Sequence, residues 1–266
     1  MQTIFMESKT IEESIIEAMD GRDVEIIKFL PYIFQDSWEI GSFPEEIIKI
    51  IKKHKPKRDD LKVLDLGSGK GAVSIKIALE LGYNCFGIDA IEEFVQFSNK
   101  KSKEHSVENI CKFETNDIRT RIKTLEKYDI IILGAIGPVF GNYQNTLSKL
   151  LHHLNPDGIV IIDDAFVEDD CNRNYPNVLR RSDLIKQTKY AGMKIIEIIT
   201  IDDIPDINIS EQFDNEFKKL QKRCIELMEK YPEKEKLFKE HIENQRREYD
   251  ILENEIIPAM FLIKKS

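Results

Sequence analysis

The chain has 266 residues, of which 41% are hydrophobic and 33% charged, and its formal net charge at pH 7 is −9. This length allows one large core with an insertion, and the negative charge argues against a nucleic-acid partner. No apolar run approaches the roughly 20 residues that cross a bilayer, and the first residues lack a signal-peptide pattern. We therefore expect a cytoplasmic protein with no membrane association. The four cysteines have neither zinc-site nor disulfide spacing.

Residues 1–60 predict a helical cap. Thr10 and Glu13 form a capping-box pair ahead of apolar residues spaced on one helical face. Further helices are predicted over 23–30 and 44–51. The segment between them carries Trp38, the single tryptophan of the chain.

Residues 61–202 alternate apolar strands with helical patterns. Strands are predicted over 62–66, 84–88, 109–114, 129–133, 158–162 and 194–201, with helices over 72–81, 91–103, 118–125, 145–154 and 182–191. A turn at Asn155-Pro156-Asp157-Gly158 is expected to lead into the fifth strand. Strands rich in Ile and Val that alternate with helices indicate an α/β fold with a mostly parallel sheet covered on both faces.

The alternation stops after Ile201. Residues 203–256 are charged and predict a helical insertion, in which apolar residues recur at spacings of three and four from Phe213 to Leu227. Tyr231-Pro232 divides the insertion into two helices. We expect a hairpin that packs on itself and serves as a lid, and residues 257–266 then supply a last strand over 259–264.

A glycine-rich loop, Gly67-Ser68-Gly69-Lys70-Gly71-Ala72, joins the first predicted strand to its helix. It fits the dinucleotide pattern G-x-G-x-x-G/A, with Asp89 about 20 residues on to hold a ribose hydroxyl. An NAD(P)-dependent oxidoreductase is therefore one interpretation, and an S-adenosylmethionine-binding protein is the other.

Three features favour S-adenosylmethionine. Asp65 places a carboxylate where this cofactor presents an ammonium group, whereas it would repel a pyrophosphate. Gly71 adds a third glycine and extends the pattern to D-x-G-x-G-x-G. Asp117 follows the third strand beside Ile118, in a position to bind an adenine amino group. Asp65, Asp89 and Asp117 all come at the carboxyl ends of predicted strands, where open α/β sheets bind ligands.

With these motifs the sequence resembles the class I S-adenosylmethionine-dependent methyltransferases over roughly residues 40–264. The resemblance rests on residues 63–72, 87–89, 116–118 and 154–163. It implies a Rossmann-like sheet of seven strands in which the last strand is antiparallel and lies between the fifth and sixth. It also implies a cofactor site, with S-adenosylhomocysteine as the product, formed by Asp65, Gly67, Ser68, Gly69, Gly71, Asp89, Ala90, Asn116, Asp117, Ile118 and Gly134.

The methyl acceptor is left open. The Asn/Asp-Pro-Pro-aromatic motif of amide- and base-methylating branches is absent after the fourth strand, where residues 133–141 read LGAIGPVFG. Gly134 also replaces the first acid of a catechol-type metal site, so no metal is expected. The resemblance then favours the small-molecule branch, including uncharacterised members with a helical insertion before the last strand, with N, O or S as the acceptor atom.

Acceptor-side candidates are Trp38, Tyr143, Asp164 and Tyr249, and no catalytic residue is assigned. A non-catalytic cofactor-binding regulator remains an alternative function. We expect a monomer or a homodimer.

Overall fold

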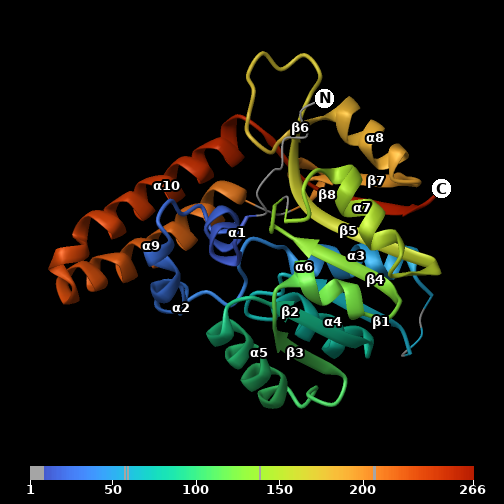
Figure 1. Ribbon diagram of the computed structural model, residues 1–266, viewed down its shortest axis with the longest axis horizontal. Helices are drawn as coiled ribbons and strands as arrows, with labels where there is room; N and C mark the ends of the chain where they lie inside the picture. Colours follow the sequence, from blue (N-terminus) through green and yellow to red (C-terminus); the bar gives the residue numbers. More distant parts are fainter. Residues whose placement is uncertain (1–8, 57, 59, 138, 206–207) are drawn as a thin grey trace.

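The computed structural model describes residues 9–266 except residues 57, 59, 138 and 206–207, so the first eight residues of the predicted cap lie outside the described part. A twisted sheet forms its centre, with strands in the order β3-β2-β1-β4-β5-β8-β7 (Figure 1). A two-residue strand, β6, pairs with β5 beside this path. The bounds are β1 (Lys62–Leu66), β2 (Asn84–Asp89), β3 (Cys111–Thr115), β4 (Tyr128–Gly134), β5 (Leu154–Val167), β6 (Leu179–Arg180), β7 (Met193–Thr200) and β8 (Ile257–Lys265).

The last strand has the predicted place and direction. β8 lies between β5 and β7 and is antiparallel to both, while β3, β2, β1, β4 and β5 pair in parallel. The Rossmann-like fold predicted from the sequence is therefore confirmed.

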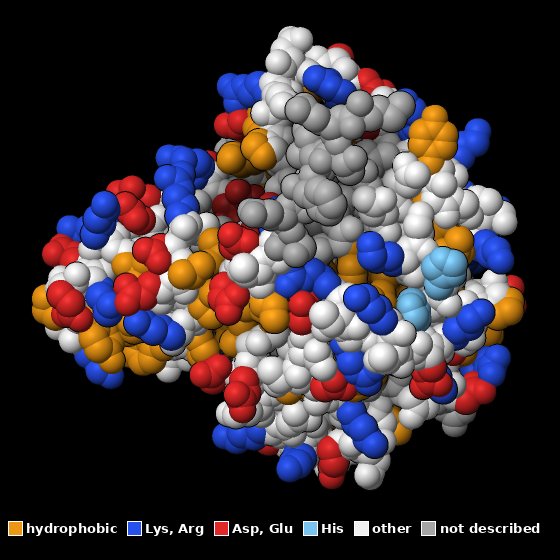
Figure 2. All heavy atoms as spheres, in the orientation of Figure 1, with side chains coloured by type: hydrophobic (Ala, Val, Ile, Leu, Met, Phe, Trp, Pro, Cys, Tyr) orange, Lys and Arg blue, Asp and Glu red, His pale blue; other side chains and the backbone are white. Residues whose placement is uncertain are grey.

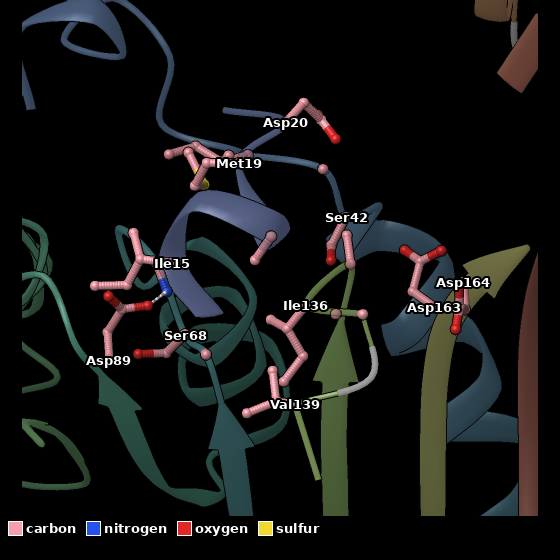
Figure 3. A pocket seen from close by; sticks show the side chains of 18 of the residues that line it. Ile15, Met19, Asp20, Ser42, Ser68, Asp89, Ile136, Val139, Asp163 and Asp164 are labelled. Carbon is pink, nitrogen blue, oxygen red and sulfur yellow. Dashed lines mark hydrogen bonds between the residues drawn. The ribbon is translucent and has the colours of Figure 1, made fainter. Parts of the chain in front are cut away.

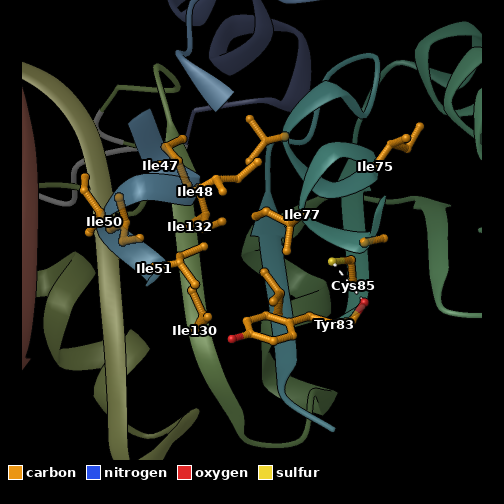
Figure 4. Close-up of a cluster of buried hydrophobic side chains, with 14 of the residues drawn as sticks. Ile47, Ile48, Ile50, Ile51, Ile75, Ile77, Tyr83, Cys85, Ile130 and Ile132 are labelled. Atoms are coloured by element: carbon orange, nitrogen blue, oxygen red, sulfur yellow. Dashed lines mark hydrogen bonds between the residues drawn. The ribbon is translucent and has the colours of Figure 1, made fainter. Parts of the chain in front are cut away.

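Helices cover both faces of the sheet because successive strand side chains point to opposite sides. Val63, Ile130 and Ile132 pack toward α3 (Pro44–His54), α4 (Ala72–Leu81) and α5 (Glu92–Glu104), and Figure 4 shows the isoleucines of α3 in this cluster. Leu64 and Ile131 face the opposite layer, formed by α6 (Ile118–Arg121), α7 (Tyr143–Leu151) and α8 (Arg181–Tyr190).

The N-terminal cap begins at α1 (Ile11–Ala18). The predicted capping box is present, with the Glu13 N–H donating to Thr10 Oγ1 at 3.1 Å and the Thr10 N–H donating to Glu13 Oε2 at 2.7 Å. The helix predicted over 23–30 is present but is not an α-helix over most of its length. That segment is a 3₁₀ helix, η1 (Val24–Phe29), followed by a single α-turn, α2 (Leu30–Ile33), with Pro31 in its first turn.

The insertion between β7 and β8 is a helical hairpin of α9 (Ile209–Lys230) and α10 (Glu235–Asn254), joined through η4 (Pro232–Lys234). Leu220, Cys224 and Phe238 are buried against residues of η1 and α2, so the hairpin packs on the cap as well as on itself. It stands out from the sheet in Figure 1 and forms the lobe at the left of Figure 2. Two short 3₁₀ segments, η2 (Ile122–Thr124) and η3 (Ile201–Asp203), complete the described elements.

The bounds of the predicted strands lie within two residues of the expected ones, except in β5, which is longer at both ends. β5 already begins at Leu154, because Leu154 pairs with Tyr128 and Ile159 pairs with Ile130. Residues 155–158, which were expected to form a turn ahead of the strand, are instead an irregularity within it. β3 starts at Cys111, two residues later than predicted. Within the described ranges, no helix has both the length and the apolar character that a membrane crossing requires.

Candidate functional site

A cavity of about 470 Å³ opens at the carboxyl edge of the sheet. Its walls come from the glycine-rich loop, the segment after β4, the end of β5, α1 and α10. In Figure 3, α1 lies across this cavity, with Ile15 and Met19 above Ser68 and Asp89. Open α/β sheets bind ligands at this edge, so the cavity lies where a cofactor is expected.

The structure brings most of the predicted site residues into this one cavity. Its lining includes Asp65, Gly67, Ser68, Gly69, Asp89, Ala90, Asn116, Asp117, Ile118, Gly134, Trp38, Asp164 and Tyr249. Gly71 and Tyr143 are not part of the lining. A Cβ at Gly71 would instead meet Phe113 and Ser98 at 2.7 and 2.8 Å, so this glycine permits α4 to pack closely.

The glycine-rich loop is held in a tight turn after β1. The N–H groups of Gly67 and Ser68 both donate to the Ile88 carbonyl, at 2.8 and 3.0 Å. Gly67 has φ +72°, and a Cβ there would lie 2.3 Å from Cγ2 of Ile136. At Gly69, by contrast, an added Cβ would meet no described atom within 4 Å. The backbone is thus open toward the cavity at the residue where a ligand would approach.

Asp65 is almost fully buried below this loop. Ser74, on α4, donates to its Oδ2 at 2.7 Å. Burial, with a further contribution from the charge of Asp89, raises the pKa of Asp65 to about 6, while the bond from Ser74 opposes the rise. A cationic ligand group would stabilise the ionised carboxylate.

Asp89 ends β2 and is held by backbone donors. Gly69 N–H donates to Oδ2 at 2.8 Å, and Ile91 N–H donates to Oδ1 at 2.9 Å. Burial nevertheless raises the pKa of this carboxyl. Each carboxylate oxygen retains further acceptor capacity, which ribose hydroxyls could use. Ser68 belongs to the glycine-rich loop, and its Oγ is buried with no hydrogen-bond partner among the described residues.

The predicted adenine side contains an ion pair that the sequence did not suggest. Asp117 caps α6 and accepts hydrogen bonds from the Arg119 side chain at 3.0–3.1 Å. Burial opposes ionisation of Asp117, but the bonds from Arg119 outweigh it and lower its pKa. Arg119 also donates to the Lys9 carbonyl at 2.6 Å and to Ser14 at 3.1 Å, so it links this side of the cavity to α1. Asn116 donates to Glu114.

The N-terminal cap closes tightly on the centre of the cavity. A Cβ at Gly134 would lie 2.2 Å from Ser42 Oγ, which explains why the end of β4 carries no side chain. Trp38 donates from its indole to the Lys70 carbonyl at 3.0 Å and stacks on His105. Its ring thereby holds the cap against the glycine-rich loop.

The acceptor side centres on the end of β5. Asp163 is 8% exposed, and its Oδ2 is buried with no hydrogen-bond partner among the described residues. Burial and the neighbouring Asp164 raise the pKa of Asp163 to about 7, while hydrogen bonds to this carboxyl from the Phe43 N–H and the Ser42 side chain oppose the rise. Asp164 accepts a hydrogen bond from the Tyr143 hydroxyl at 2.9 Å, so Tyr143 supports the cavity from behind its wall.

Apart from Trp38 and Tyr249, sequence reasoning missed the cavity residues contributed by the cap and by α10. Asp20 follows α1 at φ +52° and accepts a hydrogen bond from Gln245 at 3.3 Å. Burial, followed by the charge of Glu248, raises the pKa of Asp20 to about 7. Tyr249 stacks on Phe213 of α9, with ring centroids 4.8 Å apart. No local pattern marks Asp20 or Glu248, since their proximity depends on how the hairpin packs on the cap.

Among the residues that the structure describes, no group of three or more His, Cys, Asp or Glu side chains is arranged to hold a metal ion.

Comparison with known proteins gives a family for this fold. A family model described as a methyltransferase domain matches residues 57–258. The ubiquinone biosynthesis O-methyltransferase of Rickettsia akari is 30% identical over 122 residues, which are 44% of this chain and 46% of that protein. The chain thus spans less than half the length of the curated relatives it matches.

Two solved structures show the same architecture. The S-adenosylmethionine-dependent methyltransferase of Thiobacillus denitrificans, in complex with S-adenosylhomocysteine, has 18% identity and a TM-score of 0.72 over 90% of this chain and 98% of that chain. Its counterpart from Geobacter sulfurreducens has 17% identity and a TM-score of 0.71 over the same shares. The chain therefore belongs to the methyltransferase domain family and has the class I S-adenosylmethionine-dependent methyltransferase fold.

Proposed function

We propose that the protein is an S-adenosylmethionine-dependent methyltransferase that acts on a small molecule. The observation that carries this proposal is the pair of carboxylates, buried Asp65 and half-buried Asp89, which line the cavity together with the open backbone at Gly69. The family assignment favours methyl transfer over the oxidoreductase alternative. A cytoplasmic location and a monomeric or homodimeric state stay predictions of the sequence.

The residues present fit this cofactor. Asp65 would face the ammonium group, and the pairing would offset the cost of keeping a carboxylate buried. Asp89 would accept hydrogen bonds from the ribose hydroxyls, and Ser68 Oγ would gain the partner it lacks. Ile118 would supply an apolar wall for the adenine, with Asn116, Asp117 and Ala90 around it and Gly134 below the sulfur.

When bound, this cofactor supplies a methyl group already activated on a sulfonium. The protein then has to orient the acceptor and exclude water. α1 covers the cavity, and Arg119 ties it to the adenine side. Trp38 and Tyr143 would support the walls, while Asp164 and Tyr249 remain candidates on the acceptor side.

Calorimetric titration with S-adenosylhomocysteine tests this function. We expect micromolar affinity for the wild-type protein, no binding of NAD, and at least about 30-fold weaker binding for Asp89→Ala, because hydrogen bonds to a carboxylate contribute about 1.5–3 kcal/mol each. Glu108→Ala, an exposed acid outside the cavity, is the control and should bind as the wild type does. Absence of S-adenosylhomocysteine binding would refute the proposal. Cofactor binding without methyl transfer to any acceptor would favour the regulator alternative.

A further inference from the structure

The part of the cavity away from Asp89 is lined by carboxylates that the proposed cofactor does not use, and we call it the acceptor half. Figure 3 shows Asp163 and Asp164 on the side opposite Asp89, with Asp20 above Ser42. Glu248, on α10, lines the same half, and its charge acts on Asp20. The amino and ribose groups of the cofactor are matched by Asp65 and Asp89, which leaves these other acids without an assigned partner.

Asp20, Asp163, Asp164 and Glu248 make no ion pair with any residue that the structure describes, and this distinguishes them from three other acids of the lining. Glu17 pairs with Lys9 at 2.5 Å, Glu39 pairs with Lys76, and Asp117 pairs with Arg119 at 3.0 Å.

The basic side chains of the lining do not neutralise this half. Lys70 is 4% exposed and donates its ammonium protons to the carbonyls of Phe34, at 2.8 Å, and Ser37. The Arg119 side chain donates to Asp117 and to the Lys9 carbonyl just before α1. Among the described residues, the acceptor half of the cavity therefore has four carboxyl groups that no basic side chain of the lining neutralises.

Asp163 gives an independent indication of a ligand. Its side chain is more than nine-tenths buried at the cavity wall, and Oδ2 has no hydrogen-bond partner among the described residues. An unpartnered buried carboxylate oxygen is costly, and such groups gather at functional sites. A ligand that donates a proton or carries positive charge would satisfy it.

The remaining walls suit the apolar part of such a ligand. Phe213 and Tyr249 stack with an interplanar angle of 13° beside Glu248, and both line the cavity. Aromatic faces attract cations as well as apolar groups. Ile15, Leu252 and Ile256 extend the apolar lining around the acids.

We propose that the methyl acceptor is an organic amine that binds as its ammonium ion between Asp163 and the Asp20–Glu248 pair. This inference rests on the methyltransferase function proposed above and names its substrate class. An acceptor with a carboxylate or phosphate in this half would be repelled by the same side chains.

The assignment gives Asp163 a role in the reaction. An ammonium nitrogen has no free electron pair, so its proton passes first to the Asp163 carboxylate. The freed pair on nitrogen forms the new N–C bond while the C–S bond of the methyl donor breaks, and the electrons of that bond stay on sulfur. The products are the methylated ammonium ion, S-adenosylhomocysteine and a proton on Asp163 that leaves to solvent.

Fragment binding to the protein loaded with S-adenosylhomocysteine tests the proposal without an activity assay. The probes are butylamine with butanol and valerate, and phenethylamine with 2-phenylethanol and 3-phenylpropionate, titrated at pH 7.5 by saturation-transfer NMR. We expect at least one amine to bind ten-fold or more tightly than its matched alcohol, and no binding of the carboxylates. Asp163→Asn and Glu248→Gln should each weaken the binding of that amine about ten-fold.

Two controls keep the outcomes distinct. Asp170→Asn removes one charge from the exposed loop after β5 and should leave amine binding unchanged. Each variant is first titrated with S-adenosylhomocysteine, which reports a folded cofactor site. If that ligand binds but the amines bind no better than the alcohols, or if Asp163→Asn and Glu248→Gln bind amines as the wild type does, the amine assignment is wrong. If S-adenosylhomocysteine does not bind at all, the proposed function itself fails.

Discussion

Replacing Asp163 with asparagine should stabilise the ligand-free protein at pH 8 and change its stability little at pH 4.5. Burial and the charge of Asp164 raise the pKa of the Asp163 carboxyl from 3.8 to about 7. Between these values the folded state holds a proton that the unfolded chain has released, so the free energy of unfolding falls as pH rises from about 4 to 7 and then levels off. A shift of about three pKa units corresponds to at most about 4 kcal/mol above pH 7.

Asparagine removes this charge penalty but leaves an amide that needs hydrogen-bond partners. We therefore expect a net gain of about 2–3 kcal/mol at pH 8. Urea unfolding, followed by the fluorescence of Trp38, measures the gain at both pH values. Asp170→Asn, with its exposed side chain, should change stability by less than about 0.5 kcal/mol. Equal gains at pH 4.5 and pH 8, or a loss at pH 8, would refute the reasoning.

Three further predictions concern the cofactor half. Binding of S-adenosylhomocysteine should release about half a proton per protein at pH 6 and almost none at pH 8, because the ammonium group of the ligand lowers the pKa of Asp65 from about 6. Calorimetry in buffers of different ionisation enthalpy measures the number of protons released, and equal release at both pH values would contradict the prediction. Arg119→Ala should speed both trypsin cleavage at Lys9 and the dissociation of S-adenosylhomocysteine several-fold. The control Arg121→Ala, which loses an ion pair with Glu114, should change neither rate. Unchanged rates in Arg119→Ala would refute the role of Arg119 in holding α1. Gly67→Ala should destabilise the fold by more than about 2 kcal/mol, since φ is +72° and the new Cβ would lie 2.3 Å from Ile136. Gly192→Ala has similar strain at φ +75° but an ordinary contact at 3.7 Å, so equal losses of stability in both variants would rule out the clash.

The sheet could be predicted because its strands are short, apolar and bounded by turns or helix starts. The direction of β8 came from the family resemblance and was correct. The errors occurred where local pattern was a poor guide. Residues 155–158 contain turn residues, yet they form an irregularity within β5 because Leu154 already pairs with Tyr128. The segment over 23–30 has helical spacing but adopts a 3₁₀ helix.

The cofactor half was visible in the sequence because Asp65, the glycine-rich loop and Asp89 lie within 25 residues of one another. The acceptor half was visible only at Asp164 and Tyr249. Asp20 and Gln245 are 225 positions apart and meet only because η1 and α2 pack against α9 and α10. The pairing of Asp117 with Arg119 was also missed, since it depends on the capped turn that begins α6.

A crystal structure of the protein with S-adenosylhomocysteine tests the central claim most directly. The claim is that the carboxyl edge of the sheet holds the cofactor with its sulfur facing the acidic half of the cavity. We predict ribose hydroxyls bonded to Asp89, an ammonium group on the Asp65 side of Gly69, and Asp163 beyond the sulfur. A ligand bound outside this cavity, or with its adenine against Asp163, would contradict the claim.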